Sequence, residues 1–189
     1  MNIFVLDNDP VIAAQQQCDK HVVKMIVESA QMLSAAHRML DGKLISKPSI
    51  SGKQMVKYYD LFEGSDDLEA ENLYYKAVHF NHPCSVWSRE TDSNYMWHWE
   101  HFSALCDEYT HRYGKIHKTD SLLRYPLRSL PRNIDKGELT PFPLAMGSNP
   151  ECMFPEDPVK SYRLFYQTKQ ERFDMVWTSR EAPNWFSYR

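Results

Sequence analysis

The segment CDKHVVKMIVESAQML, residues 18–33, has the clearest structural pattern in the chain. Its apolar residues recur at steps of three and four, which is the spacing of one face of an α-helix. That face contains Val22, Val23, Ile26, Leu33 and, one turn later, Ala36. The pattern predicts a long amphipathic helix around which the rest of the chain is organised.

The opposite face of this helix is polar in an unusual way. His21, Lys24, Glu28 and Gln31 follow one another at steps of three or four, so their side chains form one ridge. An imidazole, an amine and a carboxylate within reach of each other make a plausible acid–base group. The same ridge also fits an ordinary surface with a Lys24–Glu28 pair worth a few tenths of a kcal/mol, so both interpretations stay open.

Length and composition indicate one globular domain over residues 1–189. Apolar residues make up 42% of the chain and aromatic residues 13%, which is enough for a substantial core. The formal net charge of −3 argues against a protein that binds duplex DNA through an overall basic surface. A local basic stripe is compatible with this charge.

The four cysteines are widely spaced, at Cys18, Cys84, Cys106 and Cys152, without a CxxC pair. No signal peptide is visible, and no apolar run approaches the roughly 20 residues that span a bilayer. We therefore expect free thiols, a cytoplasmic protein and no membrane association.

The other elements follow from capping and turn signals. Asn2–Leu6 is short and apolar, which predicts a strand or an extended N-terminal arm. Asp9-Pro10 and Asp157-Pro158 place a capping carboxylate before a proline, a pattern typical of helix starts. Gly42 is expected to end the central helix in a left-handed conformation.

We expect a compact all-α fold. The helices are predicted over Val11–Gln17, Leu68–Val78, Thr91–Tyr113 and Val159 to about Trp177, with loops at Lys43–Gly52 and Lys115–Met153 and an amphipathic patch at Lys53–Phe62. The segment Lys115–Met153 is expected to contain short helical pieces between its prolines. Its basic residues are either phosphate contacts or solvated charges: Lys115, Lys118, Arg124, Arg128 and Arg132.

Two further segments carry candidate binding residues. Pro83 interrupts the helical pattern and holds Asn81 and His82 in non-helical backbone, where functional residues are common. The C-terminal tail is rich in aromatic residues, at Trp185, Phe186 and Tyr188. These rings are expected either to pack against the core or to stack on a base.

Three motifs that follow one another along the chain, together with one further segment, resemble the phage-type pyrimidine-dimer DNA glycosylases. Asp19-Lys20-His21 followed by six residues and Glu28 resembles the early helix of that family. Arg112-Tyr113-Gly114 resembles the basic end of its middle helix, and Asn81-His82-Pro83 resembles a segment of its bacterial members. Pro183-Asn184-Trp185 and the aromatic residues that follow it resemble its C-terminal tail.

The resemblance implies a compact all-α domain that breaks a bond between a base and its sugar. In the family an N-terminal α-amine attacks the sugar C1′ and forms a Schiff base. By position, the resemblance implies that Glu28 supports this chemistry, that His21 lies near the site and that the aromatic tail helps to hold nucleic acid. An amine nucleophile beside a carboxylate is chemically sensible, because the carboxylate can also stabilise an oxocarbenium-like sugar.

The chain also departs from the family. Position 2 is Asn2, which is bulky for removal of the preceding methionine, so the free amine is expected to be that of Met1. The extra arginines that the family carries on its early helix are absent here. Val27 precedes Glu28, and Gln31 stands at a position where a basic side chain would help to bind phosphate. These differences favour an altered substrate, such as a modified base, a single strand or a free nucleotide or nucleoside, and leave open a water nucleophile activated by Glu28.

Two other classes of function remain open. A metal-dependent hydrolase would take ligands from His98, His101 and either Glu108 or His111, although the HExxH pattern is absent. A non-catalytic protein would bind a nucleotide or a partner on the same fold. We expect DNA or a free nucleotide as the partner and no cofactor, with Glu28, His21 and Met1 as catalytic residues. The expected binding residues are Lys24, Gln31, Asn81, His82, Arg89, Arg112, Trp185, Phe186 and Tyr188.

Overall fold

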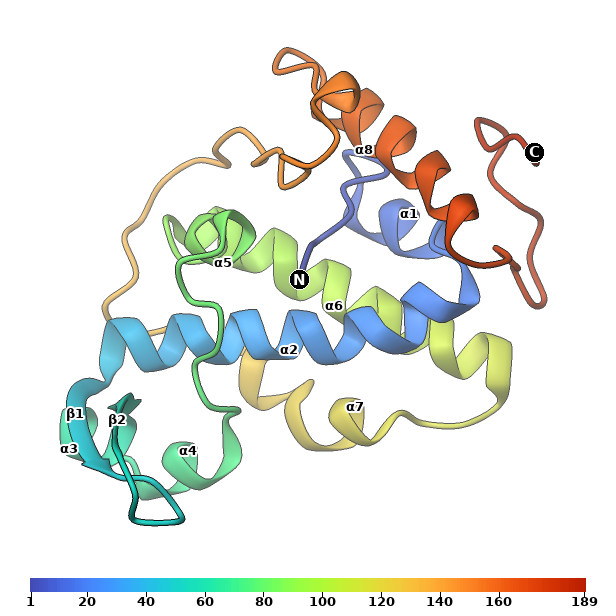
Figure 1. The fold of residues 1–189 in the computed structure, drawn as a ribbon. Helices are drawn as coiled ribbons and strands as arrows, with labels where there is room; N and C mark the ends of the chain where they lie inside the picture. Colours follow the sequence, from blue (N-terminus) through green and yellow to red (C-terminus); the bar gives the residue numbers. More distant parts are fainter.

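Two long helices pack against each other at the centre of the fold, in a computed structural model that describes residues 1–189. They are α2, Asp19–Asp41, and α6, Asp92–Tyr113, and Figure 1 shows them side by side. Both were predicted from the spacing of their apolar residues. Val22, Ile26 and Leu33 of α2 are fully buried, whereas Val23, which we assigned to the same face, is 39% exposed.

Shorter helices surround this pair. They are α1 (Pro10–Gln15), α3 (Leu61–Ser65), α4 (Leu68–Leu73), α5 (Pro83–Trp87), α7 (Lys118–Leu123) and α8 (Pro158–Gln167), with 3₁₀ turns at Pro126–Arg128, Pro150–Cys152 and Thr168–Glu171. The predicted caps are present: Asp9 accepts from two backbone N–H groups of α1, and Asp157 accepts from one in α8. Gly114 ends α6 in the left-handed region, with φ of 62°.

A two-stranded antiparallel hairpin interrupts the helical fold. Strand β1 covers Lys43–Pro48 and strand β2 covers Met55–Asp60, with Lys43 opposite Asp60. The fold is therefore mostly helical, and the expectation of a loop over Lys43–Gly52 was wrong for Lys43–Pro48, while residues 49–52 lie in the turn of the hairpin. Most side chains of β1 are exposed, so the sequence lacks the apolar alternation by which a half-buried strand is recognised.

Gly42 has an extended backbone, with φ of −88° and ψ of 164°, and the prediction of a left-handed helix end was wrong. The chain passes directly from α2 into β1, so it needs no reversal at this residue. A glycine is needed here for another reason: a Cβ atom at position 42 would collide with the carbonyl oxygen of Arg38.

Two other helices are shorter than predicted. Helix α4 ends at Leu73, because the buried Arg38 guanidinium takes the backbone oxygens of Tyr74 and Tyr75, which a longer helix would use internally. Helix α8 ends at Gln167 and is followed by a 3₁₀ turn. No helix combines the length and the apolar content that crossing a bilayer requires.

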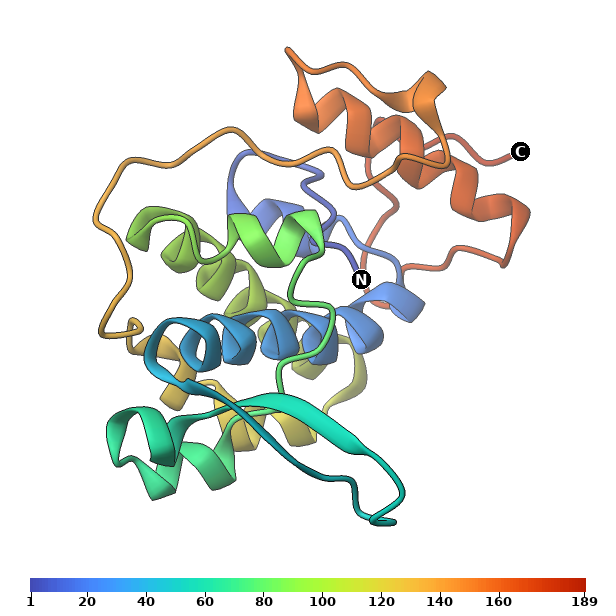
Figure 2. The ribbon, with the colours of Figure 1, turned by 60° about the vertical axis from the view of Figure 1, so that its left-hand side comes forward.

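The N-terminal arm is extended and buried, without a strand partner, as one of the two predicted alternatives. Residues 2–6 belong to the interior, and Figures 1 and 2 show the arm rising from α2 toward α8. Phe4 adopts a positive φ of 53° and lies between His21 of α2 and Tyr166 of α8, with ring centroids 4.7 and 5.1 Å away. The arm therefore brings the start of the chain to the middle of α2.

Candidate functional site

Glu28 of α2 lies at the point where the arm meets this helix. Its Oε2 atom accepts a hydrogen bond from the backbone N–H of Asn2 at 3.1 Å and lies 3.5 Å from the α-amine of Met1. Its Oε1 atom lies 3.2 Å from the ammonium of Lys24, one helical turn earlier. One largely buried carboxylate thus joins the N-terminal amine and a lysine.

The side chain of Asn2 fixes the arm in this position. Its Nδ2 donates to the carbonyl oxygen of Ala145 at 3.0 Å, and its Oδ1 accepts from the backbone N–H groups of Ile3 and Phe4. Asn2 is 7% exposed, so these bonds form in a desolvated environment. The side-chain amide of Asn2 therefore anchors the arm through these hydrogen bonds.

His21 lies beside this group as a neutral base. Burial lowers the pKa of His21 to about 3, and the positive charges of Lys24 and Lys169 act in the same direction. Its Nδ1 forms a hydrogen bond of 2.7 Å with the hydroxyl of Tyr166, and its ring stacks on Phe4. At neutral pH His21 is therefore an uncharged ring that can take part in hydrogen bonds, but it does not serve as a cationic acid.

Around Glu28 the surface forms a pocket of about 510 Å³, which we call the Glu28 pocket. Its charged lining is cationic apart from Glu28, and consists of the Met1 amine, Lys20, Lys24, Lys169 and Arg172. Its aromatic lining consists of Phe4, Phe165 and Phe173 together with His21. The pocket therefore offers a carboxylate, an amine, several cations and flat apolar faces within one concave surface.

Lys169 is the most perturbed amine of the pocket. Burial is the main reason that its pKa falls to about 8, and the nearby Arg172 and Lys24 contribute. Its Nζ lies 3.3 Å from the centre of the Phe165 ring, and the ammonium of Lys20 lies 4.7 Å from that of Phe173. Both lysines are thus held against aromatic rings that also line the pocket.

The structure brings together four of the residues predicted from sequence: Met1, His21, Lys24 and Glu28. His82 lies nearby, since the Met1 amine contributes to lowering its pKa after burial, while Glu28 opposes this effect. His82 also caps α5 by accepting from the backbone N–H of Cys84. Asn81 is exposed, and neither it nor Gln31 lines the pocket.

Arg89 and Arg112 lie outside the pocket and are tied to the protein itself. Arg112 is buried, and its guanidinium bonds to Glu108, to Asp19 and to the carbonyl oxygen of Gln15. Arg89 donates to the carbonyl oxygens of two residues near α5. Both arginines were predicted to bind substrate, but neither lines the Glu28 pocket, and their contacts are with the protein itself.

The aromatic tail also lies away from the pocket. Phe186 is buried against Trp177 at a centroid distance of 4.7 Å, and Trp185 donates from Nε1 to the Oε1 atom of Gln16. Tyr188 is 68% exposed and contacts the rings of Trp177 and Phe186 edge-on. Of the two roles proposed for the tail, packing against the core is therefore the one that its contacts fit.

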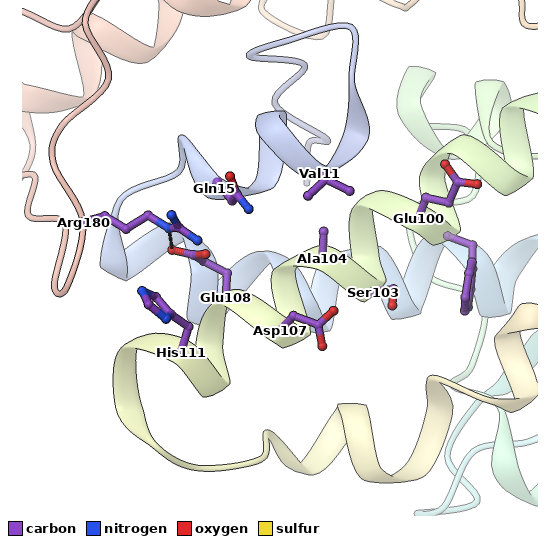
Figure 3. A pocket seen from close by; sticks show the side chains of 10 residues that line it. Val11, Gln15, Glu100, Ser103, Ala104, Asp107, Glu108, His111 and Arg180 are labelled. Carbon is purple, nitrogen blue, oxygen red and sulfur yellow. Dashed lines mark hydrogen bonds and ion pairs between the residues drawn. The ribbon is translucent and has the colours of Figure 1, made fainter.

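A second pocket, of about 390 Å³, lies between α1 and α6 and contains two of the residues considered as metal ligands. Figure 3 shows Glu108 paired there with Arg180, with His111 beside them. The Nε atom of Arg180 donates to Oε1 of Glu108 at 2.5 Å. Glu108 also accepts from Arg112, so two guanidiniums already neutralise its carboxylate.

The other two proposed metal ligands, His98 and His101, are fully buried elsewhere along α6. They bond to Ser88 and Gln17, respectively. No group of three or more His, Cys, Asp or Glu side chains is arranged to hold a metal ion. The arrangement of side chains therefore does not support a His-ligated metal site on α6.

Several pocket residues were missed in the sequence. Lys20 precedes Lys24 by one turn on the ridge of α2, so helical spacing alone would have included it. Lys169 and Arg172 are three residues apart in a segment we expected to be helical, but nothing in the sequence indicates that this segment packs beside α2.

Comparisons of the chain with protein-family models, with curated proteins and with solved structures found no match.

Proposed function

We propose that this protein is a glycosylase that breaks the bond between a nucleobase and its sugar, with Glu28 as the catalytic carboxylate. One observation carries the proposal: the α-amine of Met1 lies 3.5 Å from Glu28 within a cationic pocket lined by aromatic rings. Each part matches a requirement of the reaction. The rings suit a base, the cations suit phosphate, and the carboxylate and amine suit attack at an electron-poor carbon.

The chemistry follows from the positions of the two groups. As the bond from C1′ to the base nitrogen breaks, its electron pair leaves with the base, and positive charge develops on the sugar. The carboxylate of Glu28 stabilises that charge, as carboxylates do in glycoside hydrolysis. The α-ammonium of Met1 gives one proton to Glu28, and the freed amine forms a bond to C1′. A second proton from this nitrogen goes to the departing base. The ring oxygen takes the proton back from Glu28 as the C1′–O4′ bond opens and leaves a protonated imine, from which water releases the sugar.

The position of Asn2 means that an α-amine would still face Glu28 if Met1 were removed. Its backbone nitrogen lies 3.1 Å from the Glu28 oxygen that faces the Met1 amine. A chain without Met1 would therefore still present an α-amine to the same carboxylate. The resemblance of Asp19-Lys20-His21 and Glu28 to the early helix of the pyrimidine-dimer glycosylases supports the proposal, because His21 and Glu28 both line the pocket.

Borohydride trapping tests the proposal directly. The protein is incubated with abasic-site DNA, with dimer-containing DNA and with nucleotides, in the presence of sodium borohydride, and adducts are mapped by peptide mass spectrometry. We expect a reduced adduct on the N-terminal α-amine, and the intact mass identifies that residue as Met1 or Asn2. Blocking the amine with a short N-terminal extension should remove the adduct.

Substitution of the carboxylate supplies the first prediction. Glu28→Gln should lower the rate of base release by at least about 100-fold, because it removes a charge that the transition state requires. The matched control is Glu69→Gln, which changes an exposed glutamate of α4 and should leave the rate unchanged. Ligand binding without base release from any substrate, unaffected by Glu28→Gln, would instead identify a binding protein.

A further inference from the structure

The arginines outside the Glu28 pocket are mostly engaged by carboxylates. Of the ten arginines in the chain, seven form ion pairs, and all seven lie outside the pocket: Arg38, Arg112, Arg124, Arg132, Arg163, Arg180 and Arg189. Arg89 donates to backbone oxygens, and Arg128 lies over the ring of Trp99. Arg172 is the one arginine whose side chain has neither an ion pair, nor a hydrogen bond, nor an aromatic partner. It lines the Glu28 pocket.

The other cations of the pocket have one carboxylate, Glu28, among them. Lys20 and Lys24 come from one turn of α2, and Lys169 and Arg172 come from the 3₁₀ turn after α8 and the residue that ends it. Glu28 is the one acidic side chain of the lining, and it already faces Lys24 and the Met1 amine. Like charges held together in this way repel: burial is the main cause of the lowered pKa of Lys169, and the charges of Arg172 and Lys24 lower it further.

An anion in the pocket would remove this repulsion. A phosphate monoester carries close to two negative charges at neutral pH and accepts several charge-assisted hydrogen bonds. Two lysines and an arginine without carboxylate partners are suited to it, since they need not first break an ion pair. The surplus of positive charge in an otherwise acidic chain therefore indicates a phosphate subsite beside the catalytic carboxylate.

We propose that the substrate of the Glu28 pocket is a free nucleoside monophosphate, whose phosphate is bound by Lys20, Lys169 and Arg172. This inference rests on the proposed glycosylase function and specifies its substrate. Overall, the nucleotide and water give a free base and a sugar 5-phosphate. The base leaves with the electron pair of the glycosidic bond and takes up a proton, and the oxygen of water ends on C1′ of the sugar.

Size and charge favour a monomer over a polymer. A pocket of about 510 Å³ falls within the range for sites that enclose one small molecule. Duplex DNA carries a phosphate charge every ~1.7 Å along its axis and needs a continuous line of cations. Here Arg172 is flanked in the chain by the exposed carboxylates of Glu171 and Asp174, and the net charge is −3. These neighbouring carboxylates disfavour a polyanion that runs past the pocket, whereas a single phosphate needs only the cations of the lining.

The test compares ligands that differ in phosphate. The four common 2′-deoxynucleoside 5′-monophosphates, the matching nucleosides, and single-stranded and duplex oligonucleotides are titrated by calorimetry, and base release is followed by chromatography. We expect a monophosphate to bind at least ten times more tightly than its nucleoside and to release its base. The double variant Lys169→Gln/Arg172→Gln should lose most of this preference for the monophosphate, while binding of the nucleoside stays the same.

Controls separate this inference from the proposed function. Lys53→Gln, which changes an exposed lysine at the turn of the hairpin, should keep the preference for phosphate, and thermal melting should show that the double variant is folded. Base release from an oligonucleotide but not from any monophosphate would overturn the inference and leave the glycosylase proposal standing. Equal affinity for nucleoside and monophosphate would also overturn it. Tight monophosphate binding without base release from any ligand would support the phosphate subsite and overturn the glycosylase.

Discussion

Four of the eight histidines are buried inside the fold, and their protonation is suppressed there. They are His21, His37, His98 and His101, and in each of them burial is the main reason for a lowered pKa. The pKa falls to about 3 for His21 and His101 and to about 4 for His37. One ring nitrogen of His98 and one of His101 have no hydrogen-bond partner. These rings are stable inside the protein only while they are neutral.

Acid should therefore destabilise the protein within a defined pH range. In the unfolded chain these imidazoles take up protons near pH 6.5, but in the folded chain the groups stay neutral down to about pH 4. Since the unfolded state binds more protons in this range, the free energy of unfolding should fall by up to about 1.4 kcal/mol per pH unit for each histidine. Urea unfolding at pH 7, 6 and 5 measures this slope.

A variant assigns part of the slope to one ring. His101→Gln removes a titrating group and keeps a side chain that can bond to Gln17, the present partner of His101. The free energy of unfolding of this variant should fall less steeply between pH 6.5 and 5 than that of the wild type. Identical slopes would show that His101 does not contribute and would contradict the prediction.

At the scale of single residues, the sequence predicted part of the candidate site. Lys24 and Glu28 were identified because a helix places residues four apart side by side, and the structure contains that pair. His21 belonged to the same ridge, but its burial was not predicted, because the covering rings of Phe4 and Tyr166 come from distant parts of the chain. Local spacing predicts neighbours on one helix and carries no information about what packs over it.

At the scale of elements, the starts of helices were predicted best where a capping side chain sets them. Asp9 and Asp157 each cap the helix that the sequence assigned to them. Prediction failed where tertiary contacts decide. The β1–β2 hairpin has few buried side chains, and α4 is cut short by hydrogen bonds to the buried Arg38. Neither feature has a local signal in the sequence.

The junction between α2 and the hairpin depends on close backbone contact with α3. A Cβ atom at Gly64 would lie 2.5 Å from the carbonyl oxygen of Asp41 and 2.6 Å from Gly42. Gly64→Ala should therefore push the backbones apart and lower stability by about 1–3 kcal/mol, the usual cost of overpacking. Thermal and urea unfolding measure the loss.

The matched control for this variant is Gly147→Ala. No atom lies within 4 Å of a Cβ atom built at Gly147, and its φ is negative, so alanine should fit without strain. We expect the free energy of unfolding to change by less than about 0.5 kcal/mol. Equal effects of the two substitutions would refute the claim that backbone contact at Gly64 holds α3 against the end of α2.

At the scale of the whole molecule, contacts between distant segments assemble the candidate site. Asn2 reaches Ala145, His21 reaches Tyr166 and Phe4 reaches Phe165, and each of these pairs is more than 140 residues apart in the chain. The sequence predicted most of the helices correctly, but it could not predict which of them meet. For this reason Lys169 and Arg172 were not placed beside Glu28.

The two roles considered for the C-terminal tail, packing against the core and binding nucleic acid, predict different results for substitutions in the tail. Phe186 is 7% exposed and packs on Trp177, whose Nε1 donates to the carbonyl oxygen of Gln16 just after α1. If the tail stabilises the fold, Phe186→Ala should lower the free energy of unfolding by about 3 kcal/mol. Affinity for ligands, measured below the lowered melting temperature, should not change. Tyr188→Ala removes an exposed ring and should change neither the stability nor the affinity for ligands. If the tail instead binds nucleic acid, the Tyr188 variant should lose affinity for nucleic acid without any loss of stability.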